Sequence, residues 1–193
     1  SLFGQVANAG PQRTSAMDGS DNIRRITFAA EGADFDPAVD PTGQWLVYSS
    51  TQHRKTSDLY LKRVDGVAVT QLTADPANNV MPSFSPDGKW FVTAAYRLDH
   101  VDIYSASDFK LVKRIFIESL PSHLAFDKES KTVFVTIQQT GRLIAIDLET
   151  QTMKWNVGIG VSPAGVVMLP DDRRLLVGMT GEDGLLVVDP QDG

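Results

Sequence analysis

Apolar runs of four to six residues alternate with short polar turns along most of this 193-residue chain, and the alternation recurs at a fixed distance. Two sets of apolar residues show a spacing of 42 residues: Phe84, Phe126 and Met168, and Val101, Leu143 and Leu185. The runs are rich in β-branched and aromatic residues, which favour strands buried on both faces. Several short strands in a repeat of about 40 residues are typical of a β-propeller, in which each repeat forms one blade.

Each repeat indicates four strands. In the repeat that begins near residue 81, a short run leads into the turn Ser85-Pro86-Asp87-Gly88, where Pro fixes φ and Gly accepts a positive φ. Three further apolar runs follow in the same repeat, at 90–95, 101–105 and 112–117. The plan recurs on both sides, so we expect blades at about residues 37–80, 81–121, 122–163 and 164–193, the last of them one strand short.

We expect the missing strand to come from the beginning of the chain. Residues 22–28 resemble residues 69–73, and both segments follow an Asp-Gly turn. We therefore predict an all-β propeller of four-stranded antiparallel blades in which residues 22–28 complete the last blade, so that 22–193 form one domain. Such a closure covers both sheet edges that a row of blades leaves open. A half-ring that pairs with a second copy into a larger ring is the competing geometry. Residues 1–21 are expected to be a flexible leader or the remnant of a strand.

Composition narrows the classes of function. The net charge is −6 and there is no basic patch, which argues against nucleic acid and anionic membrane surfaces as partners. Absence of cysteine excludes thiol catalysis, Cys-ligated zinc and disulfides, and is compatible with the periplasm. No apolar run approaches the roughly 20 residues of a membrane helix, so we expect no membrane insertion. The first residues do not have the pattern of a signal peptide.

Two types of repeat motif meet near residue 90. Residues 13–90 resemble TolB-like propeller repeats, through DLYL at 58–61, QLT at 71–73 and PSFSPDGK at 82–89. Residues 91–193 resemble YVTN-type repeats, which are similar to the propeller of haem-containing nitrite reductases, through VFVT at 133–136, AIDLET at 145–150 and VVDP at 187–190. The change falls inside one blade. A divergent natural propeller and a chimera of two propeller fragments, joined in evolution or in a laboratory, are both compatible with it.

His123 is the one candidate cofactor ligand. It begins a predicted inner strand, and inner strands of a propeller line the central channel. In the haem-containing relatives a His ligates the iron, so the resemblance implies haem as one occupant of this position, and imidazole is a good axial ligand. The alternative is a channel or turn His without a ligand. Nothing else in the sequence indicates contacts for a cofactor, so none is expected beyond this candidate.

The other chemistry-bearing residues form no recognisable site. His53 and His100 lie in predicted loops, and no two of the three histidines have metal-binding spacing. Asp34, Asp36 and Asp40 alternate as calcium ligands can, but the pattern lacks the glycine and the terminal Glu of an EF-hand loop. Neither a nucleophile elbow nor a dinucleotide-binding motif occurs. We therefore predict no catalytic residue and no metal site.

The sequence predicts a non-enzymatic propeller scaffold that binds a protein partner. The TolB-like resemblance implies a periplasmic setting for it. One alternative is a propeller of the YVTN type that binds haem or another cofactor. Another is a recombined or engineered pair of propeller fragments with no specific biological function. Both a monomer and a homodimer are compatible with the repeat pattern.

Overall fold

The computed structural model describes residues 24–29, 31–76, 78–96 and 99–193, which form four antiparallel sheets and no helix. The predicted all-β class with four-stranded blades is confirmed, except that the last sheet has three strands. Blade 1 consists of β1 (Asp34–Val39), β2 (Trp45–Ser50), β3 (Asp58–Arg63) and β4 (Val69–Gln71). Blade 2 consists of β5 (Asn78–Phe84), β6 (Trp90–Tyr96), β7 (His100–Ser105) and β8 (Leu111–Phe116). Blade 3 consists of β9 (Pro121–Phe126), β10 (Thr132–Ile137), β11 (Arg142–Asp147) and β12 (Thr152–Gly158), and blade 4 of β13 (Pro163–Met168), β14 (Leu175–Met179) and β15 (Gly184–Val188).

The turn after each inner strand shows how the repeat is encoded locally. In blade 1 the Asp40 carboxylate accepts hydrogen bonds from the backbone N–H groups of Gln44 and Trp45, at 2.9 and 2.7 Å. Asp127 does the same in blade 3 for the N–H groups four and five residues on. The last turn residue has a positive φ in all four blades: Gly43, Gly88, Ser130 and Asp172. A capping carboxylate or hydroxyl and a residue that tolerates positive φ therefore set the inner hairpins of blades 1, 2 and 3, whereas blade 4 has Leu169 at the capping position.

The core lies between the blades. Alternate residues of the middle strands point to the two neighbouring sheets, and the first interface contains Val47, Leu59, Leu61, Phe91 and Tyr104. Equivalent clusters lie between blades 2 and 3 and between blades 3 and 4. Full burial of one such side chain stabilises a fold by about 1.5–3 kcal/mol. Packing of blade on blade therefore holds the chain together.

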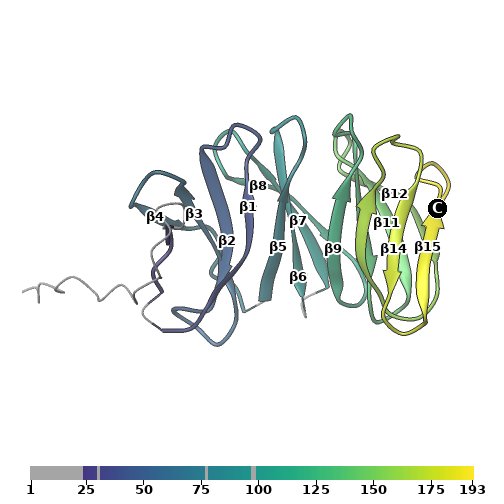
Figure 1. Ribbon diagram of the computed structural model, residues 1–193, viewed down its shortest axis with the longest axis horizontal. Coiled ribbons are helices and arrows are strands. Elements are labelled where there is room, and N and C mark those ends of the chain that lie inside the picture. Colours follow the sequence, from purple (N-terminus) through teal and green to yellow (C-terminus); the bar gives the residue numbers. More distant parts are fainter. Residues whose placement is uncertain (1–23, 30, 77, 97–98) are drawn as a thin grey trace, which may run out of the picture.

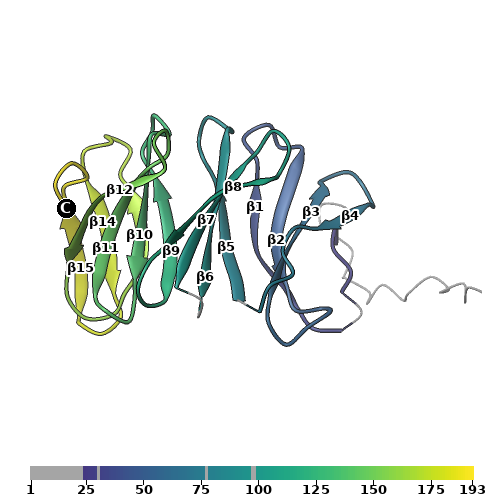
Figure 2. The ribbon, with the colours of Figure 1, turned by 180° about the vertical axis from the view of Figure 1, so that it is seen from behind.

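The blades form an open row. Figures 1 and 2 show them side by side in sequence order, with β15 at one end and the segment that precedes β1 beside β3 and β4 at the other. The inner strands β1, β5, β9 and β13 contact one another in that order. The prediction that residues 22–28 complete the last blade is therefore wrong for the described residues 24–28. These residues form no strand, and Ile26 packs on blade 1, because the apolar outer face of β2 and β3 lies beside them while β15 is at the far end.

Candidate functional site

The four inner strands carry a β-bulge at the same height. Its limits, given by the shifts of register on β1, β5, β9 and β13, are Phe35/Ala38, Val80/Ser83, Pro121/Leu124 and Pro163/Val166. One position, spaced by 45, 42 and 42 residues, lies inside all four bulges, and it is occupied by Asp36, Met81, His123 and Gly165. We call these residues the bulge ring. Bulges re-aim side chains and are over-represented next to active sites, so the bulge ring is the candidate functional site.

Two members of the bulge ring have unusual backbone conformations. Asp36 has a φ of 48° and Met81 a φ of 50°, in the left-handed region that non-glycine residues seldom adopt. Each of them precedes a proline, which normally holds the preceding residue in an extended conformation. Such strain costs about 1–3 kcal/mol per residue and gathers at functional sites. The Asp36 carboxylate also accepts a hydrogen bond from the Met81 N–H at 3.1 Å, which joins blades 1 and 2 at this height.

His123 lies on β9, as the sequence predicts, and is half-buried. Its Nδ1 is 2.8 Å from the hydroxyl of Ser122, and its backbone N–H donates to Thr136 Oγ1 at 3.1 Å. The Thr136 hydroxyl in turn donates to the carbonyl of Ala164 at 2.8 Å, which joins blade 3 to blade 4. The imidazole is thus held by Ser122, while the backbone of His123 belongs to a network that crosses from blade 3 to blade 4.

The charge state of His123 depends on burial and on a second member of the bulge ring. Burial lowers the pKa of His123 below its ordinary value of 6.5, and the negative charge of Asp36 opposes that shift. The imidazole is therefore neutral at pH 7. Because the folded pKa lies below the unfolded one, the unfolded chain binds the proton first as the pH falls below the unfolded value. His123 consequently removes stability from the fold over the interval between the two pKa values.

Replacing Asp36 with asparagine is expected to lower the pKa of His123 further. The change removes the charge that favours the imidazolium ion, whereas the amide oxygen can still accept the hydrogen bond from Met81. An NMR titration of the His123 ring measures the shift, and Asp171→Asn in an exposed turn of blade 4 is the control. An identical His123 pKa in the Asp36→Asn protein would contradict an electrostatic link between these two residues.

The structure shows what surrounds the residues that the sequence suggests as cofactor or metal ligands. The hydrogen-bond partners of His123 are Ser122 and Thr136, and haem binding at this residue stays a prediction. Among the alternating carboxylates, Asp40 caps its turn and Asp36 binds the Met81 N–H. Within the described part of the chain, no group of three or more His, Asp or Glu side chains is arranged to hold a metal ion.

Sequence reasoning missed a buried charge network at the outer side of blade 2. Arg114 on β8 donates two hydrogen bonds to the buried carboxylate of Asp102 on β7, at 2.8 and 2.7 Å, and a third to Asp75 at 3.2 Å. These hydrogen bonds raise the pKa of Arg114. His100, expected in a loop, begins β7 and is buried with its Nε2 3.5 Å from Asp102. The sequence does contain a sign of this network: Asp102 lies within an apolar run and pairs with the basic residue Arg114 of the next strand.

The bulges also had a signal in the sequence. Each inner strand contains a proline at the bulge: Pro37, Pro82, Pro121 and Pro163. Proline cannot donate a ladder hydrogen bond and is confined to edge strands and bulges. Four prolines near the repeat spacing therefore mark the inner edge of each sheet and the point where its register shifts.

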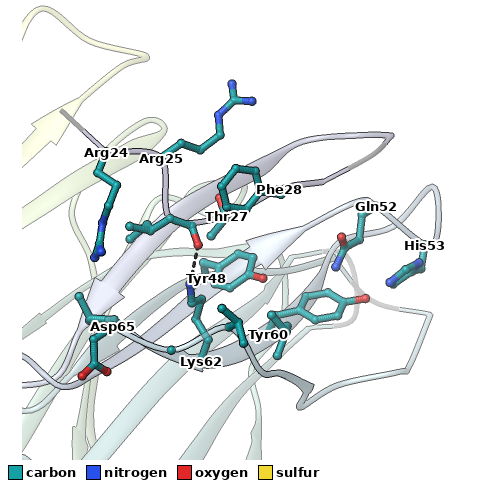
Figure 3. A pocket seen from close by; sticks show the side chains of 15 residues that line it. Arg24, Arg25, Thr27, Phe28, Tyr48, Gln52, His53, Tyr60, Lys62 and Asp65 are labelled. Atoms are coloured by element: carbon teal, nitrogen blue, oxygen red, sulfur yellow. Dashed lines mark hydrogen bonds between the residues drawn. The ribbon is translucent and has the colours of Figure 1, made fainter. Parts of the chain in front are cut away.

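Blade 1 has one face that packs on blade 2 and one that no other blade of the described residues covers, which we call its free face. A cavity of about 480 Å³ lies at this free face, under residues 24–28 (Figure 3). Tyr48 and Tyr60 are stacked in its wall with ring centroids 5.9 Å apart. Lys62 is buried and donates a hydrogen bond to the carbonyl of Ile26. Burial, with a smaller effect of nearby charge, raises the pKa of Tyr48 to about 12, so this phenol stays protonated. The cavity is the space between a sheet face and a segment that covers only part of it.

The sequence itself carries a family signature. The sequence model of the YNCE-like β-propeller family matches residues 64–192. The chain belongs to the YNCE-like β-propeller family. The match continues through residue 90, where the two types of repeat motif meet, and it reaches from the outer strand of blade 1 to the end of blade 4. The TolB-like and YVTN-type resemblances, and the chimera, stay predictions.

Many solved structures share this architecture, and 1278 chains match. One of them is the hydrazine synthase of Kuenenia stuttgartiensis, with a TM-score of 0.71 and 17% sequence identity over 89% of this chain and 49% of that chain. At this identity the likeness shows the fold alone, and the chain spans about half the length of that protein. A comparison with curated proteins gives no match. Among the described residues, no helix is long and apolar enough to cross a membrane. Function must therefore be argued from the site.

Proposed function

We propose that this chain is a non-enzymatic propeller scaffold that binds a protein partner through the bulge ring and its surroundings. The proposal rests on the contrast between the buried packing positions of the blades and the bulge ring. At the position after the inner turn, the blades have Leu46, Phe91, Val133 and Leu175, all apolar and nearly fully buried. At the bulge position they carry a carboxylate, a thioether, an imidazole and no side chain. Repeats that keep the packing and vary one surface position present a specific pattern to a partner.

The chemistry of the bulge ring supports recognition of a protein surface. Asp36 supplies a charge, Met81 a polarisable apolar group, and His123 a neutral donor and acceptor on adjacent blades. Strain and hydrogen bonds fix the backbone beneath them, so little order must be gained on binding. The polar surroundings of His123 favour this function over haem binding. The TolB-like motifs of residues 13–90 support a periplasmic location for the scaffold.

The test is retention of a partner from a bacterial envelope extract on the immobilised chain. The double variant Asp36→Asn/His123→Ala is expected to retain at least about tenfold less of the partner than the wild type, which corresponds to a loss of about 1.4 kcal/mol of binding free energy. The matched control, Asp171→Asn/Lys128→Ala, changes an acidic and a basic residue on exposed turns and should retain the wild-type amount.

Equal retention by the bulge-ring variant and the control would place the binding surface elsewhere. Recovery of the same proteins by all three chains and by an unrelated β-propeller would show that the retention is non-specific. Either result contradicts the proposed function. Circular dichroism and thermal unfolding of the double variant establish that it remains folded.

A further inference from the structure

The outer face of blade 4 is an uncovered copy of a blade interface. Leu185 and Val187 on β15 are 69% and 62% exposed. Their counterparts on the third strand of blades 1, 2 and 3 are Leu59, Val101 and Leu143, and Leu61, Ile103 and Ala145, all at most 7% exposed. Those six residues are buried because the next blade packs against them. The face of blade 4 therefore has the chemistry of a surface on which a blade packs.

Among the residues that the structure describes, the same blade has no outer strand. The third strands of the other blades, β3, β7 and β11, pair with β4, β8 and β12. In the described part of the chain β15 pairs with β14 alone, which leaves one edge of hydrogen-bonding groups without a neighbouring strand. Unpaired edges of this kind are templates for strand addition from another chain.

Residues 24–28 have the position of such an outer strand, but at the opposite end of the row. The sequence Arg25-Ile26-Thr27 corresponds to Gln71-Leu72-Thr73 at the outer strand of blade 1. Leu72 packs into the interface between blade 1 and blade 2. Ile26 packs in the equivalent way on the free face of blade 1. The segment thus corresponds to the outer strand of a preceding blade, and Figure 3 shows it beside Tyr48 and Lys62 of blade 1.

The charges on residues 24–28 and on the residues around β15 are opposite. Arg24 and Arg25 are exposed on the segment, and the residues that flank β15 include the exposed acids Glu182, Asp183 and Asp189. Opposite charges steer association and fix the register of a strand pair. The cavity beneath the segment is lined by residues of β2, β3 and the β3–β4 turn, so residues 24–28 cover this face of blade 1 only in part.

We propose that two copies of this chain form a ring in which blade 4 of each copy packs on the free face of blade 1 of the other. Residues 24–28 of one copy add to β15 of the other as the missing outer strand. Each copy supplies four sheets, so the ring has eight blades, which is within the usual range for propellers. The interface continues the stacking already present within the chain. This inference does not depend on the proposed partner function.

Size-exclusion chromatography with light scattering tests the proposal on the complete 193-residue chain. The wild type is expected at twice the chain mass. Val187→Lys places a charge at the centre of the proposed interface and is expected to weaken the dimer at least about a hundredfold. Val112→Lys makes the same change at an exposed strand position of blade 2 and should leave the dimer intact.

A wild-type chain that has the monomer mass at high concentration overturns the proposal, and shows that this face is free or is covered only by further blades of a longer protein. A Val187→Lys protein that remains dimeric also overturns it, because the copies then meet elsewhere. Circular dichroism of both lysine variants verifies their folding. Both are expected to fold, because both valines are exposed.

Discussion

Replacing Phe91 with alanine is expected to lower the free energy of unfolding by about 3–5 kcal/mol, the usual cost of removing a fully buried aromatic ring. Phe91 lies on β6 with no exposed surface. Its ring stacks on Tyr104 with centroids 4.5 Å apart and contacts Phe84 and Phe109 at 5.5 and 6.2 Å. The side chain also joins blade 1 to blade 2, so the change weakens an interface as well as a sheet.

Denaturant unfolding measures the change, at one fixed protein concentration because association would shift the midpoint. Phe116→Ala is the matched control, since the same ring at that position is 78% exposed on β8. Its effect should be below about 1 kcal/mol, as for most surface changes. Similar losses in the two proteins would contradict the assignment of the core to the space between the blades.

Arg114→Ala is expected to cost about 2–4 kcal/mol, because it leaves the Asp102 carboxylate buried without its two charged hydrogen bonds. The range lies below that of a fully buried pair, since a third of the Arg114 side chain is in contact with solvent. The contact with Asp75, which lies beyond β4, is lost as well. The network therefore contributes to the attachment of blade 2 to the end of blade 1.

The control for this change is Arg174→Ala. Arg174 also pairs with a carboxylate, that of Asp171 at 2.8 Å, but both side chains are exposed. Exposed pairs contribute about 0–1 kcal/mol, so the two arginine variants should differ clearly in urea unfolding. Equal stabilities would show that water reaches Asp102 and replaces the guanidinium.

The repeat period predicted most of the fold because propeller blades place equivalent residues in equivalent strands. Val101, Leu143 and Leu185, picked out by their spacing, occupy corresponding positions on β7, β11 and β15. The turn chemistry was equally local, since it needs only a capping side chain and a residue with positive φ. Both features depend on a few neighbouring residues, which a sequence displays directly.

Closure was not predictable in the same way. The likeness of residues 25–27 to 71–73 identifies a segment that behaves as an outer strand, and Ile26 packs as such a strand should. This likeness does not identify the sheet edge that the segment pairs with. The β15 edge of the same chain and the β15 edge of a second copy are chemically identical. Only part of the candidate site could be predicted from the sequence. The sequence singles out His123, but the electrostatic link of His123 to Asp36, two blades away, depends on the fold.

A disulfide cross-link between residues 24 and 187 tests the pairing of residues 24–28 with β15 most directly, because the chain has no other cysteine. By analogy with the pairing of Leu61 and Thr70, the proposed composite strand places Arg24 opposite Val187, at a separation suited to a disulfide. Arg24→Cys/Val187→Cys is expected to give a covalent dimer on a non-reducing gel, whereas Arg24→Cys/Val167→Cys, with the second cysteine on the inner strand of the same face, should not. A cross-linked monomer would show instead a ring closed within one chain, and no cross-link at all would contradict the pairing of residues 24–28 with β15.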